Sequence, residues 1–181
     1  MQPVLHSRRL ILRPFWAADA PEVQSLASDP RIAATTTTIP HPYPDGAAEQ
    51  WIAGHAAAFK ARQGATFAVT VRGDNALVGA VSLLDVSDPD TRAELGYRIG
   101  VPFWGQGICT EAVVRVMEFA GESWGLTRIV ARCMARNPAS ARVMEKAGLL
   151  REGHLQAHIR KNGRYEDVLL YGLSHASRRE G

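Results

Sequence analysis

Cysteine and lysine are both scarce in this chain of 181 residues. The two cysteines, Cys109 and Cys133, have neither CxxC spacing nor a neighbouring histidine pair, which argues against a disulfide framework and against a metal site. Lysine occurs only at positions 60, 146 and 161, and the 21 basic residues are scattered rather than concentrated on one predicted helix. This distribution argues against nucleic-acid binding.

Long apolar runs are absent as well. No segment is long enough to cross a bilayer, and Pro3-Val-Leu5 is far too short for the apolar region of a signal peptide. With 46% hydrophobic and 22% charged residues, a chain of this length is expected to bury about 70% of the surface that it exposes when unfolded. We therefore predict a cytoplasmic protein without membrane partners, a monomer or homodimer, with one domain over residues 1–173 and a flexible tail over 174–181.

Strand and helix patterns follow one another irregularly along the chain. The predicted strands cover residues 9–14, 66–71, 77–84, 93–99, 128–134, 152–159 and 166–173. Helices are expected from Asp19, from Asp45 to Phe59, from Ile108 and from Asn137, with a loop from Pro30 to Pro44. Because a long helix separates strands 93–99 and 128–134, these two are expected to be parallel. The prediction is an α/β (α+β) fold with a mixed, mostly antiparallel sheet of about seven strands and about four helices.

One turn in this pattern is suited to an anion. Gly105 and Gly107 leave the main chain open to close approach. A helix that begins near Ile108 leaves its first four N–H donors without internal partners, and its macrodipole places partial positive charge there. No lysine follows Gly107, which excludes a nucleoside-triphosphate P-loop. The segment therefore predicts a phosphate or pyrophosphate site, although two glycines can also serve only a tight turn.

A second compact signal follows the strand predicted at 128–134. Asn137 is a typical helix cap, Pro138 fits the first helical position, Ser140 is at the third, and Gly148 ends the helix. Taken alone, this pattern predicts a short capped helix and nothing more.

In combination and order, these motifs resemble the GNAT superfamily of acyl-CoA N-acyltransferases, and within it the RimJ/RimL branch, the ribosomal-protein alanine N-acetyltransferases. The resemblance spans nearly the whole chain. It is carried by Glu94-Leu-Gly-Tyr-Arg-Ile99, Trp104-Gly-Gln-Gly-Ile-Cys-Thr-Glu-Ala112, Asn137-Pro-Ala-Ser140, Gly148-Leu-Leu-Arg-Glu-Gly153 and Asp167-Val-Leu-Leu-Tyr171. It implies a GNAT acetyltransferase domain whose parallel central strands splay apart, with acetyl-CoA as co-substrate and no metal.

The resemblance also assigns the cofactor contacts. By this resemblance the backbone of Gly105, Gln106, Gly107, Ile108, Cys109 and Thr110 holds the pyrophosphate of coenzyme A. The main chain at Ile99, Gly100 and Val101 receives the pantetheine amides like an added strand. Asn137 would contact the pantetheine arm, and Ser140 would donate a hydrogen bond to the sulfur. Trp104 and Cys109 depart from the usual residues at their positions, but neither change removes the backbone amides.

Acetyl transfer from a thioester requires a neutral amine, a stabilised oxyanion and a proton for the leaving thiolate. A backbone N–H near Ile99 or Gly100 is a candidate for the oxyanion. The Ser140 hydroxyl is a weaker acid than a thiol, whose pKa is about 8.5, so it acts as a hydrogen-bond donor or as a relay. Many superfamily members have a tyrosine acid four residues further on, where this chain has Met144.

The general base is left open by the sequence. Glu94, Glu152, His154, His158 and water are the candidates. Glu94 is equally suited to an ion pair with an arginine on a neighbouring strand, and the two histidines are at spacings typical of a solvated strand face. Cys109 is interpreted as an apolar filler, although the helix N-terminus there favours a lowered thiol pKa.

The acceptor is the least specified part of the prediction. By resemblance, the loop from Pro30 to Pro44 and the following helix, with His41, Tyr43 and Trp51, form the wall of the acceptor site. Asp29 and Asp45 are the only acids of the loop, which favours a peptide N-terminus or a small neutral amine over a polycation. The prediction is acetyl transfer from acetyl-CoA to a primary amine, the N-terminal amine of a protein or peptide, by direct attack on the thioester. The alternatives to it are acetylation of a small-molecule amine and a non-catalytic acyl-CoA-binding module.

Overall fold

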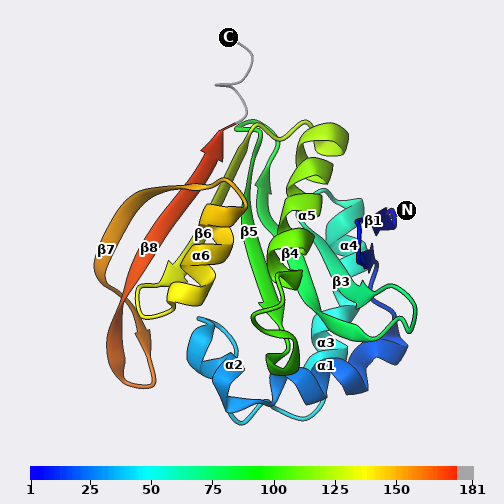
Figure 1. The fold of residues 1–181 in the computed structure, drawn as a ribbon, viewed down its shortest axis with the longest axis horizontal. Helices are drawn as coiled ribbons and strands as arrows, with labels where there is room; N and C mark the ends of the chain where they lie inside the picture. Colours follow the sequence, from blue (N-terminus) through cyan, green and yellow to red (C-terminus); the bar gives the residue numbers. More distant parts are fainter. Residues whose placement is uncertain (175–181) are drawn as a thin grey trace.

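A computed structural model describes residues 1–174 of the chain. Its strands are β1 (Leu5–His6), β2 (Leu10–Arg13), β3 (Ala65–Val71), β4 (Leu77–Ser87), β5 (Arg92–Ile99), β6 (Arg128–Met134), β7 (Leu150–Lys161) and β8 (Arg164–Ser174). They form one sheet in the order β1-β2-β3-β4-β5-β6-β8-β7 (Figure 1). The mixed, mostly antiparallel sheet that the sequence predicts is confirmed. β8 includes Ser174, the first residue of the predicted tail, and residues 175–181 lie outside the described part.

Helices cover both faces of this sheet. They are α1 (Ala20–Ala27), α2 (Pro30–Thr35), α3 (Ala47–Ala53), α4 (His55–Lys60), α5 (Ile108–Trp124) and α6 (Pro138–Lys146). The larger apolar core packs α5 against one face, where Phe67 and Val69 of β3 point. Ala68, which lies between these two residues in β3, points to the other face of the sheet. There it packs in a smaller core with α1 and α3. No helix within residues 1–174 is both long and apolar enough to span a membrane.

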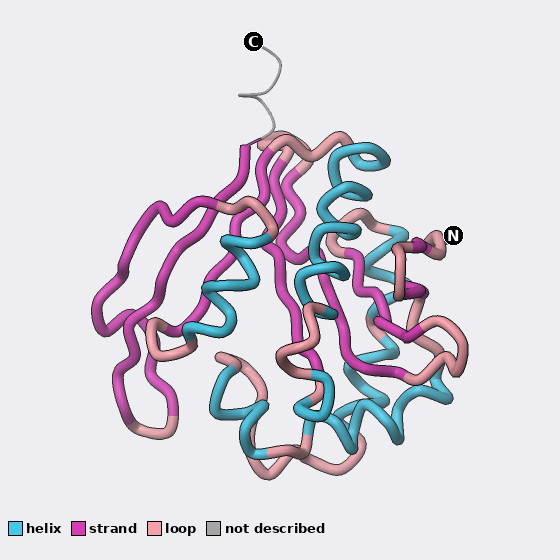
Figure 2. The backbone as a smooth tube through the Cα atoms, viewed as in Figure 1, coloured by secondary structure: helices cyan, strands magenta, loops and turns pink. Residues whose placement is uncertain are grey.

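Three elements differ from the prediction. Leu5–His6 forms a short edge strand, so the sheet has eight strands rather than seven. Residues 30–35 are helical although they were expected to be loop, because the side chain of Asp29 accepts from the Arg31 N–H and caps a proline-initiated turn (Figure 2). The helix predicted from Asp45 to Phe59 is divided at Gly54 into α3 and α4.

The parallel pair of central strands is confirmed, and it separates partway along its length. β5 pairs with β6 only from Arg92 to Leu95, opposite Arg128 to Ala131. Beyond Leu95, β5 continues along β4 and β6 continues along β8 (Figure 1). The two strands therefore open into a splay at residues 96–99, immediately before the glycine turn.

Candidate functional site

The glycine turn connects β5 to the first turn of α5. Gly105 and Gly107 adopt left-handed φ values of 76° and 74°, which residues with a Cβ rarely adopt. Gly107 is the N-cap of α5, and the first helical bond there runs from the Glu111 N–H to the Gly107 carbonyl. The N–H groups of Ile108, Cys109 and Thr110 precede that bond and point out of the helix end. The turn therefore has the open backbone amides of an anion cradle, and binding of an anion there stays a prediction.

Arg9 braces this cradle from the opposite end of the sequence. Its Nε donates to Glu111 at 2.7 Å, and its Nη1 donates to the Gln106 carbonyl at 3.0 Å. Ser7 also donates to Glu111, at 2.8 Å. Sequence reasoning missed Arg9 because 97 residues separate it from Gln106. Its half-exposed guanidinium is paired with the Glu111 carboxylate, and together they hold the turn against β2.

An open cleft of about 570 Å³ follows the outer side of α5 from this turn. Gly107, Thr110 and Val114 form its floor, and Lys146 of α6 and His6 of β1 contribute to its lining. Its volume is in the range of small-molecule and cofactor sites. Its lining includes side chains of both charges, Arg115 and Lys146 together with Glu111 and Glu118.

The strand edge at the splay offers fewer free groups than the sequence suggests. The Gly100 N–H donates to the Val78 carbonyl at 2.8 Å, so it is engaged with β4 and does not face the splay. By the alternation of antiparallel pairs, the amide and carbonyl of Ile99 point away from β4, toward the gap left by β6. The Ile99 carbonyl accepts from the indole Nε1 of Trp104 at 2.6 Å. Of the two amides considered for the oxyanion, only that of Ile99 faces the splay.

Ser140 lies beside the splay on the face of the sheet that α5 and α6 cover. Its hydroxyl is 2.8 Å from the hydroxyl of Tyr97 on β5, and the Tyr97 hydroxyl also lies 3.0 Å from the Ser140 carbonyl. Burial raises the pKa of Tyr97 above its usual range, so this phenol keeps its proton. Sequence reasoning identified Ser140 but missed Tyr97, which is inconspicuous inside a strand pattern. Met144, where many relatives have a tyrosine, is fully buried.

Asn137 connects the helices α6 and α2. Its Oδ1 accepts from the Ser140 N–H at 3.2 Å, which makes it the cap of α6 as the sequence predicts. Its Nδ2 donates to the carbonyl of Thr35 at the end of α2, at 3.0 Å. Contact between Asn137 and a pantetheine arm stays a prediction.

Glu94 lies on the opposite face of β5 from Tyr97, because side chains alternate along a strand. Both of its carboxylate oxygens accept from Arg132 of β6, at 3.0 and 2.7 Å. The ion pair considered as an alternative for Glu94 is therefore present, and it spans the strands where they begin to separate. A role for Glu94 as general base stays a prediction.

The other candidate bases lie on the exposed final hairpin. Glu152 pairs with Arg128, and His154 Nε2 lies 2.7 Å from an oxygen of Asp167. His158 is exposed. A register shift between Leu155 and Ile159 interrupts the strand alternation that would place both histidines on one face. Within residues 1–174, no three His, Cys, Asp or Glu side chains form a group that could hold a metal ion.

Cys109 does not behave as a helix-terminus thiol. Burial raises its pKa to about 12, which opposes the lowering that the dipole favours. The interpretation as an apolar filler is supported, since the side chain packs against the larger core. The expectation of a lowered thiol pKa is wrong, because removal from water outweighs the dipole here.

The residues predicted to form the acceptor wall occupy different environments. His41 is exposed, whereas Tyr43 and Trp51 pack against the smaller core. Trp51 also contacts His55, with ring centroids 4.4 Å apart, and Lys161 of the final hairpin donates to the carbonyls of Thr36 and Ile39. The loop after α2 is therefore held both by the sheet and by the β7–β8 hairpin.

His55 makes the stability of this region dependent on pH. Burial, with a smaller contribution from the nearby charge of Arg98, lowers the pKa of His55 from 6.5 to about 4. Because the unfolded chain takes up this proton near pH 6.5, its contribution to stability is present above that pH and is lost as the pH falls toward 4. We expect the free energy of unfolding, measured with urea between pH 7 and pH 4.5, to fall less steeply in His55→Gln than in the wild type.

The same change at the exposed His158, as His158→Gln, is the control and should leave the slope unaltered. If the free energy of unfolding falls equally steeply with pH in His55→Gln and in the wild type, His55 is not a source of the pH dependence.

Comparison with known proteins identifies relatives of this chain. Residues 9–150 match the model of a family described as an acetyltransferase (GNAT) domain. An uncharacterized N-acetyltransferase, YoaA of Bacillus subtilis, is 27% identical over 173 residues, which cover 96% of this chain and 97% of the relative. A ribosomal-protein-serine acetyltransferase of Escherichia coli is 32% identical over 98 residues, 54% of this chain and 55% of the relative. A spermidine N(1)-acetyltransferase of Vibrio cholerae is 28% identical over 92 residues, 51% of this chain and 53% of the relative.

Solved structures share the fold. RimL, a ribosomal L7/L12 alpha-N-protein acetyltransferase in complex with coenzyme A, superposes with a TM-score of 0.88 at 20% identity and covers 96% of this chain and 99% of its own. The microcin C7 self-immunity acetyltransferase MccE, in complex with acetyl-CoA and AMP, has a TM-score of 0.84 at 20% identity, over 93% of each chain. At these identities the likeness concerns the fold alone.

Proposed function

The chain belongs to the acetyltransferase (GNAT) domain family and is an N-acetyltransferase of that type, and we propose that it transfers acetyl from acetyl-CoA to the N-terminal amine of a protein or peptide. The observation that carries the cofactor proposal is the cradle at Gly105 and Gly107, whose outward amides suit a pyrophosphate. Solved neighbours that hold coenzyme A or acetyl-CoA support it.

The arrangement around the splay suggests how the reaction proceeds. In this proposal the pantetheine arm runs from the cradle along β5 and brings the thioester to the gap beside Ser140. The Ile99 amide stabilises the oxyanion as the amine attacks the carbonyl carbon and the tetrahedral intermediate forms. The C–S bond then breaks, and Ser140, held by the buried Tyr97 hydroxyl, donates to the departing sulfur. The proton lost by the amine passes to Glu94 or water, or through Ser140 to the thiolate.

The residues proposed to act on the sulfur and the residue proposed to accept the amine proton lie on opposite faces of β5. Ser140 and Tyr97 are on the face covered by α5 and α6, and Glu94 is on the other. An amine that enters from the Glu94 face meets the thioester in the gap between β5 and β6, without displacing the cofactor. This division supports direct attack on the thioester rather than an acetylated enzyme.

A substitution at the N-cap of α5 tests the cradle. Gly107→Val places a β-branched residue at a φ of 74°, beside the outward amides. We expect the Kd for coenzyme A, measured by calorimetry, to rise at least tenfold. Gly125→Val is the matched control, because Gly125 ends the same helix at a φ of 64° and carries similar backbone strain away from the cradle. Equal affinities for Gly107→Val and Gly125→Val would contradict the assignment of the cradle.

An acceptor screen tests the reaction itself. Purified chain is incubated with acetyl-CoA and with peptides that begin with Ala, Ser or Met, or with small amines that include spermidine. Thiol release is followed, and products are identified by mass spectrometry. Acetylated peptide N-termini are the expected products. Turnover of small amines alone would favour the small-molecule alternative, and tight coenzyme A binding without turnover of any acceptor would favour a non-catalytic binding module.

A further inference from the structure

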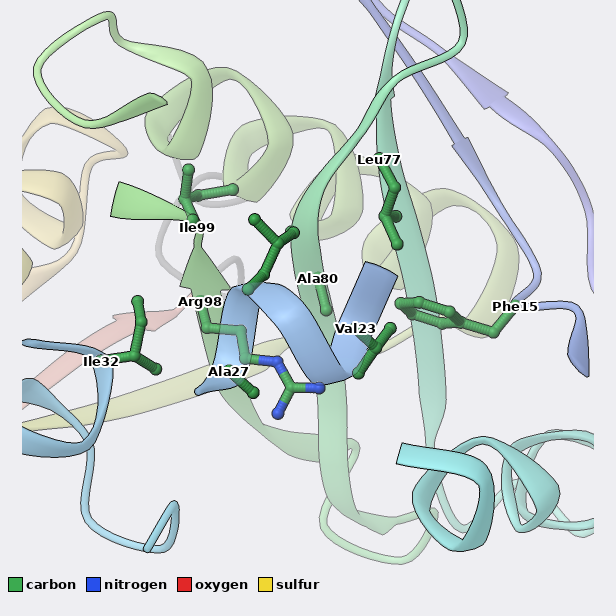
Figure 3. A pocket seen from close by; sticks show the side chains of 11 residues that line it. Phe15, Val23, Ala27, Ile32, Leu77, Ala80, Arg98 and Ile99 are labelled. Atoms are coloured by element: carbon green, nitrogen blue, oxygen red, sulfur yellow. The ribbon is translucent and has the colours of Figure 1, made fainter. Parts of the chain in front are cut away.

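Arg98 is a charged side chain that the reaction proposed above does not use. It follows Tyr97 on β5 and therefore points to the opposite face of the sheet, the face of Glu94, where α1 crosses β4 and β5 (Figure 3). Glu94 is paired with Arg132. Within residues 1–174, Arg98 has no carboxylate partner, and its Nη2 is buried without a hydrogen bond.

The surroundings of Arg98 are aromatic and apolar. Its guanidinium carbon lies 3.8 Å from the ring centroid of Trp51. Beside it is a cavity of about 20 Å³, lined on the α1 side by Val23 and Ala27 (Figure 3). Burial lowers the pKa of Arg98 from its usual value. Stacking on Trp51 recovers part of the cost of this burial, but it supplies no acceptor for the N–H groups.

A second unsatisfied atom, on His55, lies in the same region of the structure. In the part of the chain that the structure describes, three buried side-chain polar atoms have no hydrogen-bond partner: Gln24 Oε1, His55 Nδ1 and Arg98 Nη2. Trp51 contacts both Arg98 and His55, which places the last two of these atoms around the same indole ring. Their concentration beside a partly exposed arginine indicates a polar ligand rather than a packing requirement.

We propose that Arg98 selects the acceptor by binding a carboxylate that the amine substrate carries. This inference rests on the proposed acetyl transfer and narrows its acceptor to amines with a nearby negative charge. A guanidinium presents a planar fork that matches a carboxylate. Among residues 1–174, Arg98 is the only charged side chain that lines the small cavity. A polyamine would meet repulsion from Arg98, which has no carboxylate partner within residues 1–174, although Asp45 and Glu49 are exposed acids of the same wall.

Paired acceptors provide the test. Amidated peptides that begin Ser-Glu or Ala-Glu are compared with otherwise identical peptides that begin Ser-Gln or Ala-Gln, and γ-aminobutyrate serves as a small carboxylate-bearing amine. In the wild type we expect the Glu peptides to exceed the Gln peptides about tenfold in kcat/KM, and spermidine to be the poorest acceptor. A preference for γ-aminobutyrate over the Glu peptides would identify a small molecule as the source of the carboxylate and would still support the inference.

Substitution of Arg98 tests whether this residue causes the preference for Glu peptides over Gln peptides. In Arg98→Met the ratio of Glu to Gln peptides should fall to about one, and Arg98→Lys should retain part of it. Arg92→Met, an exposed arginine at the other end of β5, is the matched control and should keep the ratio. Because Arg98→Met removes an unpartnered charge, its thermal midpoint should equal or exceed that of the wild type, which excludes misfolding as the cause.

The outcomes separate this inference from the proposed function. Turnover with equal kcat/KM for Glu and Gln peptides, or a preference that survives in Arg98→Met, overturns the role of Arg98 and leaves acetyl transfer intact. If coenzyme A binds but nothing is acetylated, the proposed function fails. The affinity of the coenzyme A complex for a Ser-Glu peptide, measured by calorimetry, then decides the inference. A tenfold weaker affinity in Arg98→Met upholds it, and an unchanged or undetectable affinity overturns it.

Discussion

Ser140→Ala should lower kcat for acetyl transfer about 100-fold, the lower end of what a positioned proton donor contributes. The hydroxyl lies 2.8 Å from the Tyr97 hydroxyl beside the splay, where the leaving sulfur would develop negative charge. The substitution leaves the Ser140 N–H bonded to Asn137, so the cap of α6 survives. The measurement is steady-state thiol release at saturating acetyl-CoA, with the Kd for coenzyme A determined in parallel.

Two further variants qualify that result. Tyr97→Phe removes only the partner hydroxyl and should lower kcat less than Ser140→Ala, with the Kd for coenzyme A unchanged. Ser87→Ala, at the exposed turn between β4 and β5, should have no effect on kcat. A kcat for Ser140→Ala within twofold of the wild type would exclude Ser140 as a hydrogen-bond donor or proton relay to the sulfur and leave water as the source of the thiol proton.

The largest effect on stability is expected from Gly79→Ala. A Cβ at this position would lie 2.2 Å from the carbonyl oxygen of Arg98 and 2.9 Å from the Cα of Ile99, both backbone atoms that no rotamer change can move. Overpacking of this kind costs about 3 kcal/mol. For a chain of this size, that cost corresponds to a fall of about 10 °C in Tm. Urea unfolding and calorimetry measure the two quantities.

Gly54→Ala is the matched control, because Gly54 has a φ of −78° and nothing within 4 Å of an added Cβ. It should change the free energy of unfolding by less than about 1 kcal/mol. If Gly79→Ala proves equally mild, β4 and β5 do not approach each other as closely at Gly79 as the structure indicates.

Local signals in the sequence accounted for most of the fold. Alternating strands, the glycines of the turn, and the Asn137-Pro138 cap are recorded in neighbouring residues, so the mixed sheet, the parallel pair and α6 could be predicted. The two-residue strand at Leu5 carries too short a pattern to recognise. α2 was missed because prolines and threonines around it suggest a loop, while Asp29 and Pro30 in fact begin a helix.

Contacts between distant segments explain what the sequence did not reveal about the site. The contact of Arg9 with Gln106 joins residues 97 positions apart. Tyr97 and Ser140 meet only because β5 and α6 lie on the same side of the splay. The capture of the Gly100 N–H by Val78 and of the Ile99 carbonyl by Trp104 depends on strand register and side-chain direction. A sequence pattern specifies neither the strand register nor the direction of an individual side chain.

The carboxamide of Asn137 has a mechanical consequence for catalysis. One end fixes the backbone of the residue that would meet the sulfur, and the other holds the last turn of α2. A substrate that pushes α2 aside must stretch the Nδ2 contact, and any rotation of the amide to follow α2 weakens the hold on Ser140. A single planar group thereby connects the end of α2 to the backbone of Ser140.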